Sequence, residues 1–246
     1  MNIPVTVLTV SFNAEATIAR TIESVMNQSY PEIEYIVIDG VSRDNTAMIA
    51  RSYVEKFCET PGRTMRVISE PDKGMYDALN KGTRLAHGAI VGQINADDWY
   101  EPDAVETMAE LYGRENYDLA WGSLNVITGK GRCIKHARRG LFWSTSHWCH
   151  PAAFAKRETL LQYPYPLVNS HDDFDVATHL YVDGKKLLPV DKVISNFTFG
   201  GMSTRKSLRE AKRRLDEIYG IHRKYGMSRL YYVYRLIFEA VKYAIS

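Results

Sequence analysis

Residues 89–99 read Ala89-Ile90-Val91-Gly92-Gln93-Ile94-Asn95-Ala96-Asp97-Asp98-Trp99, an apolar run that ends in two adjacent acids. The run is typical of a short buried strand. Acids that follow such a strand lie where open α/β sheets bind their ligands. Their oxygen atoms suit Mg²⁺ or Mn²⁺, which can in turn hold a diphosphate. The alternative is a solvated Asp-Asp turn that caps the next helix, and this segment alone leaves both interpretations open.

Three more strand-like runs precede this segment, and helical patterns separate them. We expect the strands at residues 5–10, 34–38 and 66–69, and the helices near residues 18–26, 44–57 and 76–86. This order predicts a largely parallel sheet with right-handed crossovers. Asp39 ends the second strand, so its carboxylate should meet those of Asp97 and Asp98 at the carboxyl edge of the sheet.

The second half of the chain alternates less regularly. Strands are expected at residues 118–122, 125–128 and 132–136, with a helix near 157–162 and an acid-rich segment at 170–181. The chain has 246 residues, 45% of them apolar, and no internal repeat or obvious linker. We therefore predict one compact α/β domain with a helical appendage at its C-terminal end.

Cysteine usage and the first residues predict a cytoplasmic location. The three cysteines, Cys58, Cys133 and Cys149, are scattered and odd in number, which favours a reducing compartment. The N-terminus has no basic stretch before its first strand-like run, so no signal peptide is expected. No apolar run approaches the roughly 18 residues that a membrane span requires.

The net charge of +2 conceals an asymmetry. Residues 203–246 contain 11 Lys and Arg against 4 Asp and Glu, a balance of +7, whereas residues 1–202 have a balance of −5. A basic tail on an acidic body predicts contact with an anionic partner. The alternative is an ordinary solvated helix face.

The last helical pattern is amphipathic. Between residues 230 and 245 the charged side chains Arg235, Glu239 and Lys242 lie on one face, and Val233, Leu236, Ile237, Ala240, Val241 and Ala244 lie on the other. With the basic residues of 205–224, this pattern predicts an interfacial helix on an anionic bilayer. The alternative is a helix packed against the body of the protein or against a second copy of the chain in a homodimer.

Five segments occur in the order in which a known enzyme family carries its motifs: residues 5–13, 24–30, 36–46, 72–82 and 95–98. On these segments the chain resembles the glycosyltransferase family 2 enzymes, densely over residues 3–100 and more loosely over 145–205. The resemblance implies an α/β GT-A fold, with a Rossmann-like, mostly parallel central sheet flanked by helices. It places this domain at residues 1–205, with a donor half at about 1–100 and an acceptor half at about 101–205, before basic amphipathic helices at 206–246.

The resemblance also implies roles for individual residues. Asp39 matches the acid that hydrogen-bonds the nucleotide base, commonly uracil, and Val10 and Phe12 match the wall against which that base packs. Asp98 matches the nearer ligand of Mn²⁺ or Mg²⁺, and Asp97, beside it, lies near the ribose and the metal. Further contacts to the nucleotide-sugar are expected from Lys73, Asn95, His150 and Arg205. Where many relatives carry a second acid after the base-binding Asp, this chain has Gly40.

Two of these contacts have structural alternatives. His150 is expected to touch the diphosphate, the metal or the acceptor, and otherwise serves as a satisfied structural histidine. Residues 199–203 resemble a Gly-Gly loop near the active site, and Arg205, which follows it, would clamp the diphosphate. The alternative is a glycine turn in which Ser203 caps the next helix.

The catalytic base is expected in the acidic run that begins at Asp172. This run resembles a family motif whose second acid accepts the proton, which implies Asp173 as the base, with Asp172 in reserve. The alternative is that Ser170 or Asp172 caps a helix and the other acids face solvent. Neighbouring like charges should raise the pKa of one of these acids. The resemblance implies direct displacement with inversion at the anomeric carbon.

Together these features predict an inverting glycosyltransferase that moves a hexosyl or N-acetylhexosaminyl group from a nucleotide-diphospho-sugar, expected to be a UDP-sugar. The tail and the resemblance imply an acceptor linked to polyprenyl diphosphate, in bacterial surface polysaccharide biosynthesis, at the inner face of the cell membrane. Nucleic acid is not expected as a partner, because the aromatic residues form no RNA-binding strand motif.

Two alternatives share the fold. A sugar nucleotidyltransferase would carry a Gly-rich basic loop after the first strand, where this chain has Ser11-Phe12-Asn13-Ala14. A non-catalytic nucleotide-sugar-binding protein would not need the acid expected at Asp173.

Overall fold

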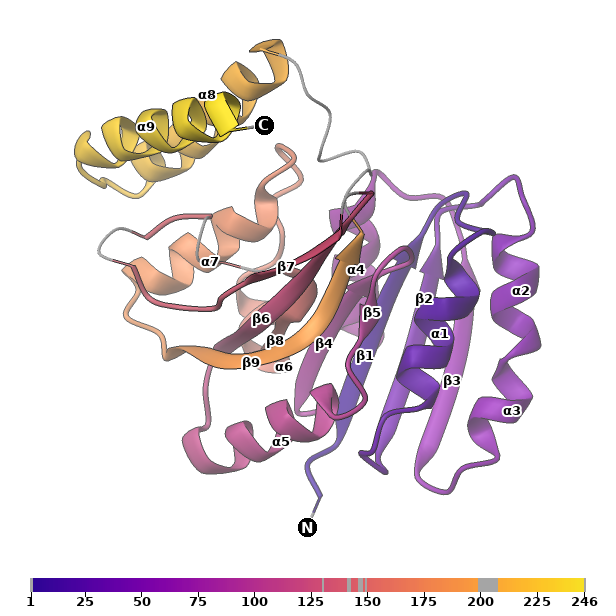
Figure 1. Ribbon diagram of the computed structural model, residues 1–246. Helices are drawn as coiled ribbons and strands as arrows, with labels where there is room; N and C mark the ends of the chain where they lie inside the picture. The colour runs from indigo at the N-terminus through magenta and orange to yellow at the C-terminus, as the bar shows by residue number, and fades with distance from the viewer. Residues whose placement is uncertain are drawn as a thin grey trace.

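A computed structural model describes residues 2–129, 131–140, 143–145, 148, 150–198 and 208–245. Its first half forms the parallel sheet that the sequence predicts, with strand order β3-β2-β1-β4 (Figure 1). These strands are β1 (Val5–Ser11), β2 (Ile33–Asp39), β3 (Arg63–Ser69) and β4 (Ile90–Asn95). Every residue of β1 is buried, as expected for a central strand covered on both faces.

Helices cover the two faces of this parallel half. Helices α1 (Ile18–Met26), α2 (Thr46–Ser52) and α3 (Val54–Cys58) lie on one face, and α4 (Met75–Leu85) lies on the other (Figure 1). The single helix expected at 44–57 is interrupted at Tyr53. The N–H of Tyr53 bonds to the carbonyl of Ala50, only three residues earlier, so the turn tightens there.

The second half makes the sheet mixed. Strand β8 (Ala153–Lys156) pairs antiparallel with β4 and with β6 (Leu119–Thr128). Beyond β6 lie β9 (Leu187–Thr198) and β5 (Trp99–Tyr100), and β7 (Gly131–Lys135) pairs with β6. The first half of the sheet is therefore wholly parallel, whereas the second half combines antiparallel pairs with one parallel pair, β6 with β9.

Strand β6 replaces two strands that were expected to end and restart near Gly122. A Cβ atom at Gly122 would lie 2.0 Å from Cγ1 of Ile194 in β9. Glycine at this position therefore makes room for the neighbouring side chain and does not end the strand.

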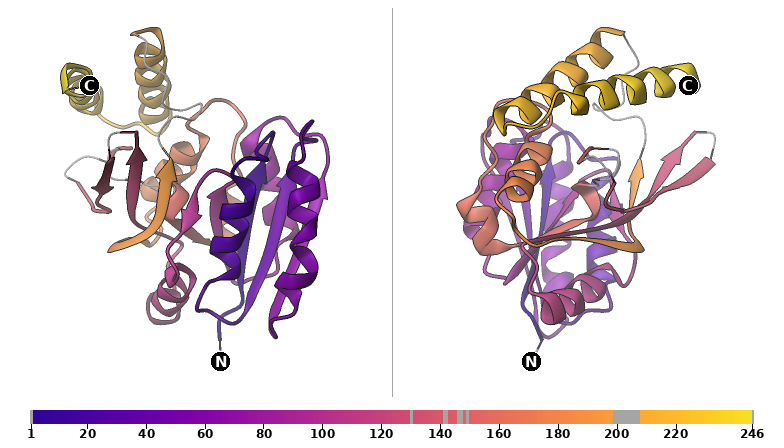
Figure 2. Two further views of the ribbon diagram at one scale, coloured as in Figure 1. Left: turned by 45° about the vertical axis from the view of Figure 1, so that its right-hand side comes forward. Right: turned by 90° about the vertical axis from the view of Figure 1, so that its left-hand side faces the viewer.

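The remaining helices are α5 (Ala104–Glu115), α6 (Arg157–Gln162), α7 (Asp172–Val182), α8 (Leu208–Lys224) and α9 (Leu230–Ile245). The pair α8–α9 lies beside α7, at the end of the molecule where the parallel strands finish (Figures 1 and 2). The expected C-terminal helical appendage is thus present. Among the described helices, none combines the length and the apolarity needed to cross a bilayer.

Candidate active site

The strand register brings the expected donor-site residues to one edge of the sheet. Val10 of β1 is in register with Ile38 of β2 on one side and with Asn95 of β4 on the other. Asp39 follows Ile38 and pairs with Ser11. The strand ends that precede or carry these acids therefore lie along one edge of the sheet.

Asp39 is fully buried, and protein donors surround its carboxylate. Oδ2 accepts hydrogen bonds from the backbone N–H of Ser42 (3.0 Å) and the hydroxyl of Ser69 (2.7 Å). Oδ1 accepts from the hydroxyls of Ser42 and Ser11. Val41, next to Ser42, has a φ of +59°, which a β-branched residue rarely adopts. Asp39 thus holds together the ends of β1, β2 and β3.

Gly40 has a role that the sequence did not reveal. A Cβ atom at Gly40 would lie 2.6 Å from Oδ2 of Asp72, so only glycine lets this carboxylate approach the end of β2. The other oxygen of Asp72 accepts a hydrogen bond from the N–H of Gly74 at 2.8 Å. The second acid that the resemblance expects after Asp39 is absent, and the loop after β3 brings a carboxylate close to that place.

Two other expected donor contacts lie at the surface of this edge. The side chain of Phe12 is 61% exposed at the end of β1, which leaves a ring face available for stacking. Lys73 is exposed, and its backbone N–H donates to Oδ2 of Asp77 at 3.0 Å. This bond fixes the loop that enters α4.

The two adjacent acids have different surroundings. Asp98 is 0% exposed; its Oδ1 accepts from the N–H of Thr198 (3.1 Å) and its Oδ2 from Nδ2 of Asn95 (3.2 Å). Burial, together with Asp97, raises the pKa of Asp98 to about 7. Asp97 is partly exposed. Asp97 is therefore the more accessible of the two carboxylates, and Asp98, the expected nearer metal ligand, is held by bonds within the protein.

Arg20 supports the acidic pair and was not singled out from the sequence. Its guanidinium carbon lies 3.8 Å from the ring centroid of Trp99, and it donates to the carbonyl of Asp97 at 2.7 Å. The hydroxyl of Thr21 donates to the carbonyl of Asp98 at 2.6 Å. Helix α1 thus fixes the backbone of both acids. An arginine on the polar face of an amphipathic helix carries no sequence signal for this role.

The carboxylates at this edge of the sheet fit a divalent ion that a diphosphate would also coordinate. Among the described residues, no group of three or more His, Cys, Asp or Glu side chains could hold a metal alone. The chain instead offers the carboxylates at 97 and 98. One or two carboxylates completed by substrate phosphates is the usual protein arrangement for Mg²⁺.

Asp172 and Asp173 differ in burial, in hydrogen-bond partners and in the direction of their pKa shifts. Asp172 is 0% exposed, and its carboxylate accepts from the N–H groups of Val168 (2.9 Å) and Asn169 (3.0 Å). Burial raises its pKa, and Asp175 adds to the effect, so one acid of the run is shifted upward as expected. These bonds tie Asp172 to the loop before α7; they do not cap the helix, whose N-cap is His171 and has no side-chain capping bond.

Asp173 faces the site instead. Its Oδ1 lies 2.8 Å from the hydroxyl of Tyr76, and its Oδ2 lies 3.0 Å from Nε1 of Trp148. Burial by itself would raise the pKa of Asp173, but His150 and these two hydrogen bonds outweigh it, so the pKa lies below its ordinary value. With 16% of its side-chain surface accessible, Asp173 is an ionised carboxylate within reach of a ligand.

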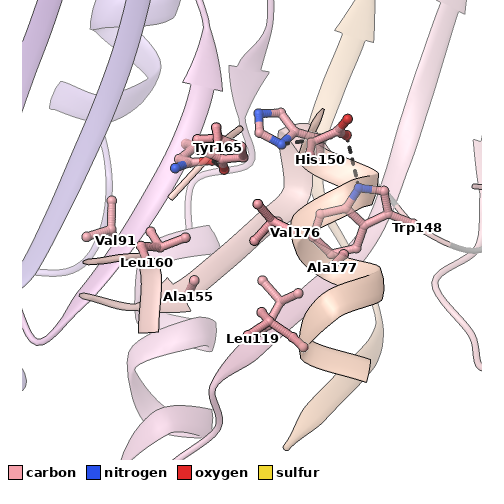
Figure 3. Close-up of a pocket in the computed structure, with 13 residues that line it drawn as sticks. Val91, Leu119, Trp148, His150, Ala155, Leu160, Tyr165, Val176 and Ala177 are labelled. Carbon is pink, nitrogen blue, oxygen red and sulfur yellow. Dashed lines mark hydrogen bonds and ion pairs between the residues drawn. The ribbon is translucent and has the colours of Figure 1, made fainter. Parts of the chain in front are cut away.

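His150 and Asp173 line one pocket together with Trp148 and Tyr165. Figure 3 shows the rings of His150 and Tyr165 near one another, with apolar side chains such as Leu160 filling the rest of the lining. Among the described residues, neither ring nitrogen of His150 has a hydrogen-bond partner. Burial lowers the pKa of His150, so its ring is neutral at pH 7 and ready to bond to a ligand.

One expected site residue cannot be placed. Arg205 and the Gly-Gly loop at residues 199–203 lie outside the described residues.

The sequence matches a protein-family model and several curated proteins. The model named glycosyl transferase family 2 matches residues 6–171, more than half of the chain. Chondroitin synthase from Escherichia coli is 34% identical over 110 residues, which is 45% of this chain and 15% of that protein. A PGL/p-HBAD biosynthesis glycosyltransferase from Mycobacterium tuberculosis is 29% identical over 149 residues, 60% of this chain and 57% of that protein. The chain thus spans less than two thirds of these relatives.

Solved structures share the fold. TarS from Staphylococcus aureus (residues 1–349), in complex with UDP-GlcNAc, superposes with a TM-score of 0.69 at 18% identity, over 90% of this chain and 65% of that one. The mannosyltransferase PcManGT from Pyrobaculum calidifontis, in complex with GDP-Man and Mn²⁺, gives 0.71 at 19% identity, over 91% and 64%. At these identities the likeness concerns the fold alone.

Proposed function

Since this chain belongs to glycosyl transferase family 2, we propose that it transfers a hexosyl or N-acetylhexosaminyl group from a nucleotide-diphospho-sugar to a saccharide hydroxyl. The observation that supports this most is the position of Asp173, whose carboxylate is ionised, accessible and hydrogen-bonded by Tyr76. Tyr76 belongs to α4, which begins directly after the donor loop at 72–74. One hydroxyl thus links the donor loop to the proposed base.

The proposed reaction is a direct displacement. The acceptor oxygen forms a bond to the anomeric carbon while the bond from that carbon to the diphosphate breaks, so the configuration inverts. Asp173 takes the proton of the acceptor hydroxyl, and the nucleoside diphosphate leaves with the bonding electrons. Proton transfer to a positioned carboxylate is worth about 10²- to 10⁴-fold in rate.

The other residues of the site hold and orient the reactants. Asp39 and the loops that hydrogen-bond to it would hold the nucleobase of the donor. The exposed ring of Phe12 would stack on that nucleobase. The neutral ring of His150 would donate one hydrogen bond to a substrate oxygen. A divalent ion held by Asp97 and the donor diphosphate would neutralise the charge that develops on the leaving group.

We take UDP-sugars as the expected donors, and a donor panel tests this choice. Isothermal calorimetry with UDP, GDP and CMP, each with and without Mn²⁺, should show binding of one nucleoside diphosphate that strengthens with Mn²⁺. Release of that nucleotide from its sugar conjugates should then rise when a saccharide acceptor is added. If no nucleotide or nucleotide-sugar binds at millimolar concentration, the proposal is wrong.

The C-terminal helices support a membrane-bound acceptor. The apolar stripe of α9, which comprises Leu230, Val233, Leu236 and Ile237, is exposed. Arg235 lies on the opposite face, but it is buried and donates to Oγ1 of Thr145 at 2.8 Å. The face that carries Arg235 therefore packs against the body, and the apolar face is left outward.

The expected basic patch is smaller than the sequence suggests. Arg213 bonds to Glu210 and Glu217, and Lys224 bonds to Asp175, so acids of the fold neutralise these two exposed cations. Other basic side chains of the tail are also exposed, among them Arg209, Lys212, Arg223 and Arg229. An exposed apolar stripe with cations nearby fits an anionic bilayer. We therefore place the acceptor on a lipid carrier, with polyprenyl diphosphate as the expected anchor.

A further inference from the structure

We infer that Glu217 of α8 is a positioning residue for the proposed base Asp173, acting through Ser170 and His171. This inference rests on the proposed function. Residues 208–245 lie beyond the part of the chain that matches the family model, so the contact is a feature of this chain's own C-terminal helices.

The carboxylate of Glu217 is hydrogen-bonded to the turn that leads into α7. Its Oε2 accepts hydrogen bonds from the hydroxyl of Ser170 at 2.8 Å and from Nδ1 of His171 at 2.7 Å. Its Oε1 accepts from Nη1 of Arg213 at 2.7 Å, and the same Nη1 donates to the Ser170 hydroxyl at 3.1 Å. Only 17% of the side-chain surface of Glu217 and of His171 is accessible, so these bonds are partly shielded from water.

The other side of the same turn touches the base. The hydroxyl of Tyr76 lies 3.2 Å from the carbonyl oxygen of Ser170 and 2.8 Å from Oδ1 of Asp173. Asp173 is the second residue of α7, so its carboxylate moves with the turn at 170–171. The hydroxyl of Ser170 is therefore hydrogen-bonded to Glu217, and its carbonyl oxygen is linked to the proposed base Asp173 through the hydroxyl of Tyr76.

A second contact fixes α8 along α7. The carboxylate of Asp175, 5% exposed, accepts two hydrogen bonds from Nζ of Lys224, at 2.8 and 2.9 Å, and one from the hydroxyl of Tyr225 at 2.5 Å. Two anchors on one helix restrict both its rotation and its sliding. Glu217 is thus presented to Ser170 in one position.

The charge of a residue in this turn also affects the pKa of the proposed base Asp173. His171 lowers the pKa of Asp173, although burial and closer partners are larger causes. Burial would raise the pKa of Glu217, and its bonds to Ser170 and His171 lower it below the ordinary value. Glu217 is therefore ionised at neutral pH and can hold both donors at once.

The test is Glu217→Gln, measured as kcat, KM and nucleotide affinity, with Glu210→Gln as the matched control. Glu210 lies on the same helix and also bonds to Arg213. Loss of a hydrogen bond to a charged group, with misplacement of the base, should lower kcat by about 10- to 100-fold. The dissociation constant for the donor nucleotide should stay within about twofold, because the nucleotide site is built on β1–β4.

A pair of further variants shows whether the effect runs through Ser170. Ser170→Ala should lower kcat, and the double variant Ser170→Ala/Glu217→Gln should be no slower than the slower single variant. Circular dichroism and thermal melts report whether each variant is folded; if Glu217→Gln does not fold, Ser170→Ala alone decides.

Four outcomes are distinguishable. A folded Glu217→Gln enzyme with unchanged kcat, or full additivity in the double variant, overturns the positioning role. An equal loss in Glu210→Gln also overturns it, because the effect would then belong to the helix as a whole. Full activity in Asp173→Asn would overturn the proposed function itself, whatever Glu217→Gln shows.

Discussion

Nδ1 of His150 lies 3.8 Å from Oδ2 of Asp173. The charge of Asp173 raises the pKa of His150, but burial lowers it by more. The two side chains therefore rest as a carboxylate and a neutral imidazole at pH 7. A neutral ring can donate to a substrate oxygen while the carboxylate accepts a proton, so the pair suits an acceptor hydroxyl placed between them.

Asp173→Asn should lower kcat by about 10²- to 10⁴-fold, since an amide cannot take the acceptor proton. Donor affinity, measured by calorimetry, should be unchanged. Asp172→Asn is the matched control: it should lower the thermal midpoint, because it weakens the bonds to the N–H groups of Val168 and Asn169, and keep kcat near that of the parent. The reverse pattern would make Asp172 the base.

Asp97→Asn should raise the Mn²⁺ concentration needed for half-maximal nucleotide binding by about tenfold or more, because it removes the accessible carboxylate. Binding of Mn²⁺ in the presence of nucleotide can be followed by electron paramagnetic resonance. Asp98→Asn should act mainly on thermal stability, because Asp98 is buried among its own hydrogen bonds. A larger metal defect in Asp98→Asn would restore Asp98 as the nearer ligand.

Gly40→Ala should displace Asp72, because the new Cβ atom would lie 2.6 Å from its carboxylate. Because this carboxylate is the free end of a partly exposed side chain and can turn away, the unfolding free energy should fall by less than about 1 kcal/mol, and donor affinity should fall because Asp72 leaves its place. The double variant Gly40→Ala/Asp72→Ala should recover stability, since the clash is gone. Failure of the second change to recover stability would contradict this account of Gly40.

His222 should make the protein less stable in mild acid. Burial lowers the pKa of His222 from 6.5 to about 4, so between these values the unfolded chain binds the proton and the folded chain does not. This stabilisation is complete above pH 6.5 and is lost as pH falls toward 4. Linkage gives about 2 kcal/mol lost between pH 7.5 and pH 5. Urea unfolding of parent and His222→Phe at both pH values checks this, and an equal pH dependence in the two would refute it.

The double variant Leu236→Ser/Ile237→Ser should release the protein from vesicles of phosphatidylglycerol in a sedimentation assay, because it removes apolar surface from the exposed stripe of α9. Met48→Ser is the control, since Met48 is an exposed apolar side chain on α2, away from the tail. A different result would be that the parent protein and the double variant both stay in the supernatant, while light scattering shows a dimer in the parent that the double variant loses. In that case the stripe binds a second copy of the chain.

The parallel half of the fold was predictable because its signal is local. Val5–Ser11 and Ile33–Asp39 are apolar runs bounded by turns, and the alternation with helices dictates the crossovers. In the mixed half the strands β6 and β7 were also predicted, but the way in which its strands pair was not. Pairing of β4 with β8 joins residues about 64 positions apart, and no short-range pattern encodes such a contact.

The candidate site was predictable to the level of the segment, and the separate roles of adjacent residues were not. Sequence reasoning located Asp97 with Asp98 and Asp172 with Asp173, but neighbouring acids differ by the direction in which each side chain points. The buried carboxylates of Asp98 and Asp172 accept hydrogen bonds from the backbone N–H groups of Thr198, Val168 and Asn169. The support from Arg20 and Glu217 comes from distant helices and was missed for the same reason.

The sequence by itself determined the order of strands and helices, the family and the acids that gather at one edge of the sheet, because hydrophobic period and motif spacing are properties of neighbouring residues. Only the tertiary structure decided that Asp173 is ionised and accessible while Asp172 is buried and bonded to the backbone of the loop before α7. It also decided that α9 turns Arg235 inward and its apolar stripe outward. Burial and electrostatic environment arise from the whole fold, since the groups that create them are far apart along the chain.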